Sequence, residues 1–128
     1  MRRTVFRVAL VLAVVVPFAL GCSSSDDAGG PVGAPAAEQA KKDGAVVLDV
    51  RTPEEFSAGH VADATNLNFE SPDFATNVAA LDKGATYVIY CRSGRRSALA
   101  AEQMAGAGLT VLDAGAMQNL LDAGYQLG

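Results

Sequence analysis

Short apolar runs alternate with helix-like segments through most of the chain. Two near-continuous apolar runs, at residues 45–50 and 86–91, each follow a glycine-containing turn, and such runs predict strands that are buried on both faces of a parallel sheet. Two shorter strands are predicted at residues 64–68 and 109–112. Helices are predicted at residues 34–42, 53–58, 72–81, 95–105 and 116–122. The pattern therefore predicts an α/β domain with a mostly parallel central sheet flanked by helices.

The start of the chain has a different pattern. Residues 8–20 form an apolar run of 13 residues behind three arginines, which suits a signal-peptide core and is shorter than the roughly 20 residues of a membrane-spanning helix. We therefore expect residues 1–21 to be a signal peptide and the protein to be secreted across the cytoplasmic membrane. The run ends in Phe-Ala-Leu-Gly-Cys, which resembles the lipobox of bacterial lipoproteins. The resemblance implies a lipid on Cys22 and a membrane-anchored lipoprotein of the bacterial cell envelope; the alternative is an ordinary signal peptide cut near Gly21.

The segment that follows Cys22 is too polar to form a core of its own. Residues 23–35 consist mainly of serine, aspartate, glycine, proline and alanine, a composition that buries little apolar surface and is typical of flexible linkers. We expect residues 22–35 to be the lipidated cysteine with a flexible tether. Residues 36–128 then form one folded domain of modest size.

The charge balance narrows the classes of partner. The whole chain has 10 basic and 14 acidic residues, which gives no broad basic surface and excludes nucleic acid as a partner. Without residues 1–21, which hold three arginines and no acid, 7 basic and 14 acidic residues remain, for a net charge near −7. Arg92, Arg95 and Arg96 are three of those seven cations, and their cluster predicts an anion site. One histidine and two cysteines are too few for a structural zinc site, and the sequence implies no metal or organic cofactor.

The arginine cluster surrounds a cysteine in a loop between a strand and a helix. Cys91 closes the apolar run at 86–91, and residues 92–97 lead into the predicted helix. Backbone N–H groups of such a loop and the N-terminus of the helix can cradle an anion, and Gly94 permits the required backbone conformation. A thiol in this place should ionise easily and act as a nucleophile. The alternative is an inert buried cysteine.

Two motifs here resemble those of a known family. Cys-Arg-Ser-Gly-Arg-Arg-Ser at residues 91–97 resembles the active-site loop of the rhodanese family, and the Asp-x-Arg to Gly-His segment within residues 48–60 resembles its first signature. The resemblance implies a rhodanese-like three-layer domain over residues 36–128. It also implies that Cys91 takes a sulfane sulfur from an anionic donor such as thiosulfate, holds it as a persulfide and passes it to a thiol or to cyanide.

The resemblance also suggests roles for the neighbouring residues. We expect Arg92 and Arg96 to pair with the donor, while Arg95 is either a binding residue or only solvated. For Asp49 and Arg51, a charge network that supports the loop and a plain strand-end ion pair are both open. We expect His60 to be a hydrogen-bonded residue of the fold and not a catalytic base. The expected substrate-binding set is Arg92, Ser93, Gly94, Arg95 and Arg96, with the loop amides around the outer sulfur.

The length of the loop after Cys91 argues against a phosphatase. Phosphatases with this fold have an arginine six residues after the cysteine, whereas here that place is Ser97 and Arg96 comes at five. The tighter loop favours binding of one sulfur atom over binding of a tetrahedral phosphate.

The chain also lacks the tryptophan that the family often has near its end, and we expect Leu120 or Leu121 to fill that core site.

Three classes of function are compatible with the sequence to different degrees. The first is an envelope-anchored sulfurtransferase whose partners are a small sulfur-containing anion as donor and a small or protein thiol as acceptor. The second is a module that carries or binds a persulfide or an anion with little turnover of its own. The third, a structural or sensing domain, is disfavoured because Cys91 is present.

Overall fold

The computed structural model describes residues 31–128. The expected signal peptide, Cys22 and most of the expected tether lie outside the described residues, so they stay predictions. Within residues 31–128, every helix is too short or too polar to span a membrane.

Four parallel strands form the central sheet, in the order β2-β1-β3-β4. Their bounds are Val46–Asp49 (β1), Thr65–Asn66 (β2), Thr86–Cys91 (β3) and Thr110–Ala116 (β4). Because each strand is followed by a crossover to the next, the carboxyl ends of all four meet at one edge of the sheet. The prediction of a mostly parallel sheet is confirmed.

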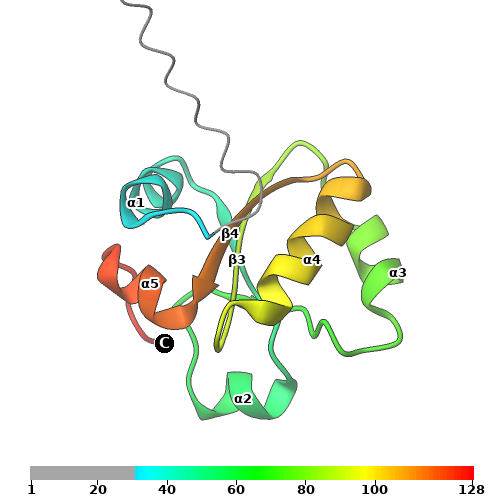
Figure 1. Cartoon of the computed structure of the whole chain (residues 1–128), viewed down its shortest axis with the longest axis horizontal. Coiled ribbons are helices and arrows are strands. Elements are labelled where there is room, and N and C mark those ends of the chain that lie inside the picture. Colours follow the sequence, from blue (N-terminus) through cyan, green and yellow to red (C-terminus); the bar gives the residue numbers. More distant parts are fainter. Residues whose placement is uncertain (1–30) are drawn as a thin grey trace, which may run out of the picture.

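Helices cover both faces of the sheet and give the domain three layers (Figure 1). Helices α1 and α5 lie on one face, α3 and α4 lie on the other, and α2 lies beyond one end of the sheet. Their bounds are Ala34–Lys42 (α1), Pro53–Ala58 (α2), Phe74–Ala79 (α3), Arg95–Gly106 (α4) and Met117–Asp122 (α5). The rhodanese-like layer arrangement expected from the motifs is therefore the one observed.

Side chains of β3 alternate between two cores. Tyr87, Ile89 and Cys91 pack into the core beneath α3 and α4, whereas Val88 and Tyr90 pack into the core beneath α1 and α5. Both faces of this strand are buried, which explains why its sequence is apolar throughout instead of alternating with polar residues.

The last strand differs from its predicted length. β4 extends to Ala116, four residues beyond the predicted end at 112. The prediction ended the strand too early because Asp113 and Gly115 are residues typical of turns. The register between β3 and β4 shifts there, so that Ile89 pairs with Asp113 and Tyr90 with Gly115. This irregularity is a β-bulge, and it brings Gly115 beside the end of β3.

The two ends of the domain pack on the same core. The Val32 N–H donates to the Asp113 carbonyl oxygen at 2.7 Å, so contact with the sheet begins before the expected boundary at residue 36. Leu120 is fully buried in the core beneath α1 and α5, while Leu121 is half-buried. Leu120 is therefore the leucine that fills this end of the core.

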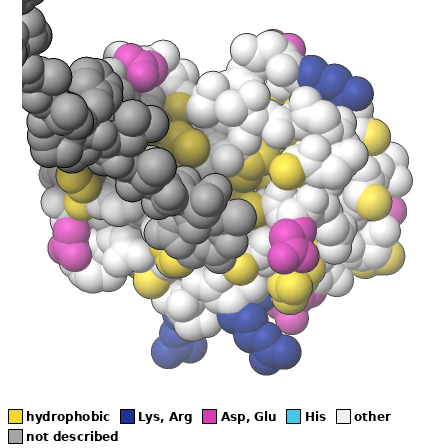
Figure 2. Space-filling view, turned by 45° about the horizontal axis from the view of Figure 1, so that its top comes forward, with side chains coloured by type: hydrophobic (Ala, Val, Ile, Leu, Met, Phe, Trp, Pro, Cys, Tyr) yellow, Lys and Arg dark blue, Asp and Glu magenta, His cyan; other side chains and the backbone are white. Residues whose placement is uncertain are grey.

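Charged side chains are dispersed over the face drawn in Figure 2. Basic and acidic groups lie apart in small groups on its uncovered part, without a continuous basic surface there. This dispersed arrangement agrees with the excess of acidic over basic residues in the sequence.

Candidate active site

Cys91 is the last residue of β3, and α4 begins four residues later at Arg95. The turn between them depends on Gly94, whose φ of +95° lies in the left-handed region that a side chain disfavours. In this conformation the Gly94 N–H donates to the Cys91 sulfur at 2.9 Å. Cys91 itself is fully buried, so the sulfur lies at the bottom of the loop, surrounded by backbone.

The loop makes the thiol more acidic than an ordinary cysteine. Burial raises the pKa of the Cys91 thiol, but hydrogen bonds from the Ser97 amide and hydroxyl and from the amides of Gly94 and Ser93 lower it by more. The net effect is a pKa below the usual value. These groups stabilise the thiolate, which is the nucleophilic form of cysteine.

The three arginines of the loop have different surroundings. Arg92 and Arg95 are exposed, and neither is among the residues 31–128 that form ion pairs. Arg96 is half-buried, and its guanidinium binds both oxygens of Glu55, at 2.7 and 2.9 Å, and one oxygen of Glu70 at 3.3 Å. The predicted contact between Arg96 and a sulfur-donor anion stays a prediction, because the carboxylates of Glu55 and Glu70 bind this guanidinium in the structure.

Asp49 and Arg51 form a buried ion pair at the end of β1. The Arg51 guanidinium donates to both Asp49 oxygens and to the Gly59 carbonyl oxygen, at 2.6 to 3.0 Å. The Tyr90 hydroxyl donates to Asp49 at 2.7 Å and accepts from the Val61 amide at 2.9 Å. Burial and the bond to Asp49 raise the pKa of Tyr90. The network joins β1, β3 and the chain after α2 directly behind Cys91.

Comparison with known proteins agrees with this geometry. Residues 34–125 match the family model of the rhodanese-like domain. The chain belongs to the rhodanese-like domain family.

Named relatives of this rhodanese-like domain include two bacterial enzymes. Thiosulfate sulfurtransferase GlpE of Pseudomonas putida is 40% identical over 76 residues, which are 59% of this chain and 66% of that protein, slightly less than two thirds. Its counterpart in Ectopseudomonas mendocina is 33% identical over 92 residues, 71% of this chain and 76% of that protein. A crystal structure of a rhodanese-related protein from Thermoplasma volcanium has a TM-score of 0.65 at 28% identity and covers 77% of this chain and 96% of that one.

Two residues of the candidate site were not assigned to it from the sequence: Ser97, which lies near the sulfur, and Glu55, which binds an arginine of the loop. The Ser97 hydroxyl oxygen lies 3.6 Å from the Cys91 sulfur and donates to the Gly94 carbonyl oxygen at 3.0 Å. Glu55 accepts from Arg96 and also caps α2 through Thr52. Ser97 belongs to the loop motif and Glu55 to the acidic first turn of α2, so each had a local signal. The partner of Glu55, however, lies on α4, 41 residues away in the sequence.

Glu55 is strongly acidic because of these contacts. The hydrogen bond from Arg96 lowers the pKa of Glu55 to about 2, against the opposing effect of burial, and amide and hydroxyl groups of Thr52 add to it. Glu55 in turn raises the pKa of Arg96. Both groups therefore stay charged at neutral pH and link α2 to the first turn of α4.

His60 has contacts of a fold residue. Its Nδ1 lies 2.9 Å from the Phe56 carbonyl oxygen, and its ring stacks on the Phe56 ring with centroids 3.8 Å apart. Within residues 31–128, His, Cys, Asp and Glu side chains form no group of three that could hold a metal ion.

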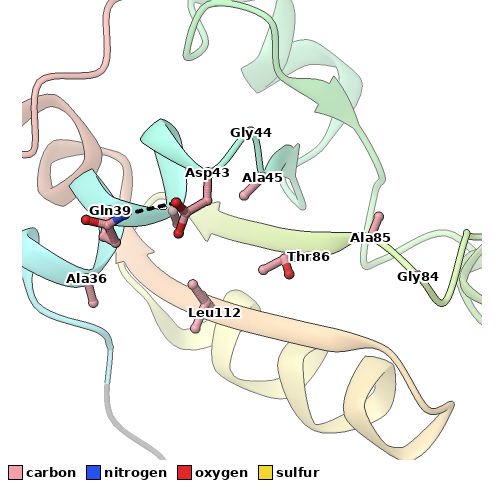
Figure 3. Close-up of a pocket in the computed structure, with 10 residues that line it drawn as sticks. Ala36, Gln39, Asp43, Gly44, Ala45, Gly84, Ala85, Thr86 and Leu112 are labelled. Carbon is pink, nitrogen blue, oxygen red and sulfur yellow. Dashed lines mark hydrogen bonds between the residues drawn. The ribbon is translucent and has the colours of Figure 1, made fainter.

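Two hollows differ in their relation to the thiol. A hollow of about 480 Å³ lies at the end of the sheet opposite Cys91. Gln39 and Asp43, which lie next to each other at the end of α1, form a hydrogen bond at its edge (Figure 3). No cysteine, histidine or lysine is among its lining residues. A hollow of about 400 Å³ lies beside the Cys91 loop. Its lining residues are Phe69, Glu70, Ser93, Arg95, Arg96 and Leu99. Of these two hollows, the second is lined by Ser93, whose amide hydrogen-bonds to the Cys91 sulfur, and the first is not.

Proposed function

We propose that this rhodanese-like domain is a sulfurtransferase that moves a sulfane sulfur from an anionic donor such as thiosulfate to a thiol or cyanide through a persulfide on Cys91. The observation that carries the proposal is the 2.9 Å hydrogen bond from the Gly94 amide to the Cys91 sulfur in a loop that lowers the thiol pKa. Relatives named thiosulfate sulfurtransferases support the same reaction class.

The first step transfers one sulfur atom. The Cys91 thiolate attacks the outer sulfur of thiosulfate, a new S–S bond forms at Cys91, and the S–S bond of thiosulfate breaks. Sulfite leaves with the electron pair of that bond. The outer sulfur keeps the negative charge that it carried in thiosulfate, so the persulfide is an anion, and the amides of the loop and the N-terminus of α4 favour negative charge there.

The second step returns the enzyme to its starting form. A thiolate or cyanide attacks the outer sulfur, the bond between the two sulfurs of the persulfide breaks, and Cys91 leaves as the thiolate. No general base is needed when the acceptor arrives ionised. Exposed Arg92 and Arg95 suit the approach of anions, and the hollow of about 400 Å³ beside the loop gives an acceptor space.

Thiocyanate formation from thiosulfate and cyanide tests the proposal. We expect donor-dependent turnover with the intact chain and none with Cys91→Ser, since a serine hydroxyl does not ionise at neutral pH. A module that only carries persulfide would form it once without sustained turnover. Equal thiocyanate formation by both chains would refute the proposal.

We also propose that the domain acts at the cell envelope. The support is the signal-like segment 1–21 and the lipobox-like end at Cys22. A lipid on Cys22 would tether the domain to a membrane through the residues between Cys22 and the packed segment that begins at residue 31, outside the cytoplasm.

A further inference from the structure

The chain immediately before α1 packs on the last residues of β4. Residues 31–33, here called the N-terminal strap, reach α1 beside that strand (Figure 1). The Val32 N–H donates to the Asp113 carbonyl oxygen at 2.7 Å. Pro31 lies so close to Gly115 that a Cβ on this glycine would be 3.0 Å from two atoms of the proline ring.

Gly115 also touches the catalytic loop. A Cβ on Gly94 would be 3.4 Å from the Gly115 Cα, and the Ser97 hydroxyl oxygen lies 3.5 Å from the Gly115 carbonyl oxygen. Gly94 and Ser97 both have groups that lie against the Cys91 sulfur. Gly115 therefore lies between the N-terminal strap and the groups that hold the nucleophile.

The conformation of Gly115 explains why it needs support. Its φ of +75° lies in the left-handed region, and it sits at the β-bulge where the ladder with β3 is irregular. Its N–H donates to the Asp113 side chain at 2.8 Å. The N-terminal strap adds a hydrogen bond to the Asp113 backbone and a proline ring against Gly115, and so fixes the bulge from outside the sheet.

We propose that the N-terminal strap is a positioning element for the Cys91 loop: Pro31 and Val32 hold Gly115 against Gly94 and Ser97, and thereby keep the amide and hydroxyl groups of the loop on the sulfur. The proposal rests on the proposed function, because it concerns the nucleophile of that reaction. It gives residues 31–33, which the sequence placed in the flexible tether, a structural role, namely to set the reactivity of the thiol.

The test measures the thiol directly. In the full chain with Cys22→Ser, Cys91 is the only thiol, and its rate of alkylation by iodoacetamide is followed against pH. Val32→Pro removes the N–H that binds Asp113, and Val32→Ala, which keeps that N–H, is the matched control. We expect Val32→Pro to move the midpoint of the pH profile upward and to slow alkylation at pH 7 by at least about threefold, with little shift for Val32→Ala.

A second variant covers the case in which Val32→Pro does not fold. Pro31→Ala keeps every backbone donor but removes the ring from Gly115, and a smaller shift in the same direction is expected. Thermal unfolding of each variant is recorded in parallel. Unchanged pH midpoints in all folded variants, with or without a lower melting temperature, would overturn the proposal. Alkylation needs no sulfur donor, so failure here is distinct from failure to form a persulfide.

Discussion

The Cys91 thiol combines full burial with easy ionisation. Burial alone would favour the neutral thiol, but the hydrogen bonds of Ser97, Gly94 and Ser93 outweigh it and lower the pKa. Above this lowered pKa the nucleophilic thiolate predominates, and below it the thiol is protonated and reactivity is lost. The activity should therefore extend to lower pH than an ordinary cysteine would allow.

Removal of the Ser97 hydroxyl should weaken this effect. Ser97→Ala removes the hydroxyl that lies 3.6 Å from the sulfur and that can turn its proton from the Gly94 carbonyl oxygen to the thiolate, while the amide of residue 97 remains. We therefore expect the pH midpoint of Cys91 alkylation to rise and the rate at pH 7 to fall by about twofold to tenfold. Ser57→Ala, at an exposed position of α2, is the control and should change neither. An unshifted midpoint in Ser97→Ala would show that the backbone amides alone set the pKa.

Tyr90 ties the strand that bears Cys91 to the rest of the domain. Its hydroxyl connects Asp49 and the Val61 amide in a buried network, and a phenylalanine would leave both without this partner. We expect Tyr90→Phe to lower the free energy of unfolding by about 1–3 kcal/mol, measured by urea denaturation. Tyr87→Phe on the same strand removes a hydroxyl that donates to the Asp82 carbonyl oxygen and should cost less; an equal or larger loss there would contradict this account.

At the scale of elements, the Glu55–Arg96 pair connects α2 to α4. Because Glu55 binds the Arg96 guanidinium through both of its oxygens, we expect Glu55→Gln to remove the stronger of the two ion pairs that hold this cation, leaving the one with Glu70, and to lower the KM for thiosulfate. Glu54→Gln makes the same change of charge at an exposed neighbour and is the matched control. A KM that falls equally in both variants would show only an effect of net charge, and a KM that rises in Glu55→Gln would contradict the prediction.

The same pair has a predictable effect on acid stability. The pKa of Glu55 is lowered from an ordinary 4.5 to about 2, so the stabilisation from its pairing is present above about pH 4.5 and is lost as the pH falls toward 2. We expect the free energy of unfolding of Glu55→Gln to depend less on pH in this window than that of the unsubstituted chain. Urea denaturation at a series of pH values measures this difference. Parallel pH dependences of the two chains would contradict it.

The sequence predicted local features of the elements better than their contacts. The two apolar runs mark β1 and β3, since strands buried on both faces need apolar residues throughout, and the Thr52-Pro53-Glu-Glu start of α2 follows from helix capping. The extension of β4 could not be predicted, because Asp113 and Gly115 are poor strand residues that a bulge and the neighbouring β3 accommodate. The partners of Arg96 depend on how α2 and α4 pack, which no local pattern records.

The candidate site shows the same division. Seven consecutive residues were enough to predict the Cys91 loop, because the groups that hydrogen-bond to the sulfur all belong to the chain between the end of β3 and the first turn of α4. The contact of Gly115 with Gly94 joins segments 21 residues apart in the sequence, and the N-terminal strap joins it from the other end of the domain. Such support depends on the folded sheet, so the sequence indicated the candidate nucleophile but not the groups that pack behind it.

For the whole molecule, the proposed location at the cell envelope depends on Cys22. If this residue carries a lipid, the protein expressed in a bacterium should sediment with membranes, and Cys22→Ser should move it to the soluble fraction while leaving sulfur transfer intact. Fractionation followed by immunodetection measures this. Equal distribution of the two chains would indicate another route or an ordinary signal peptide.

The central claim for the whole molecule is that Cys91 carries sulfur as a persulfide. Intact-mass spectrometry of the full chain with Cys22→Ser, before and after incubation with thiosulfate, tests it most directly, beside the same chain with Cys91→Ser. We predict a gain of one sulfur atom that requires Cys91 and disappears when cyanide or a thiol is added. No gain with thiosulfate or with a persulfide donor, or a gain of equal size without Cys91, would contradict the account.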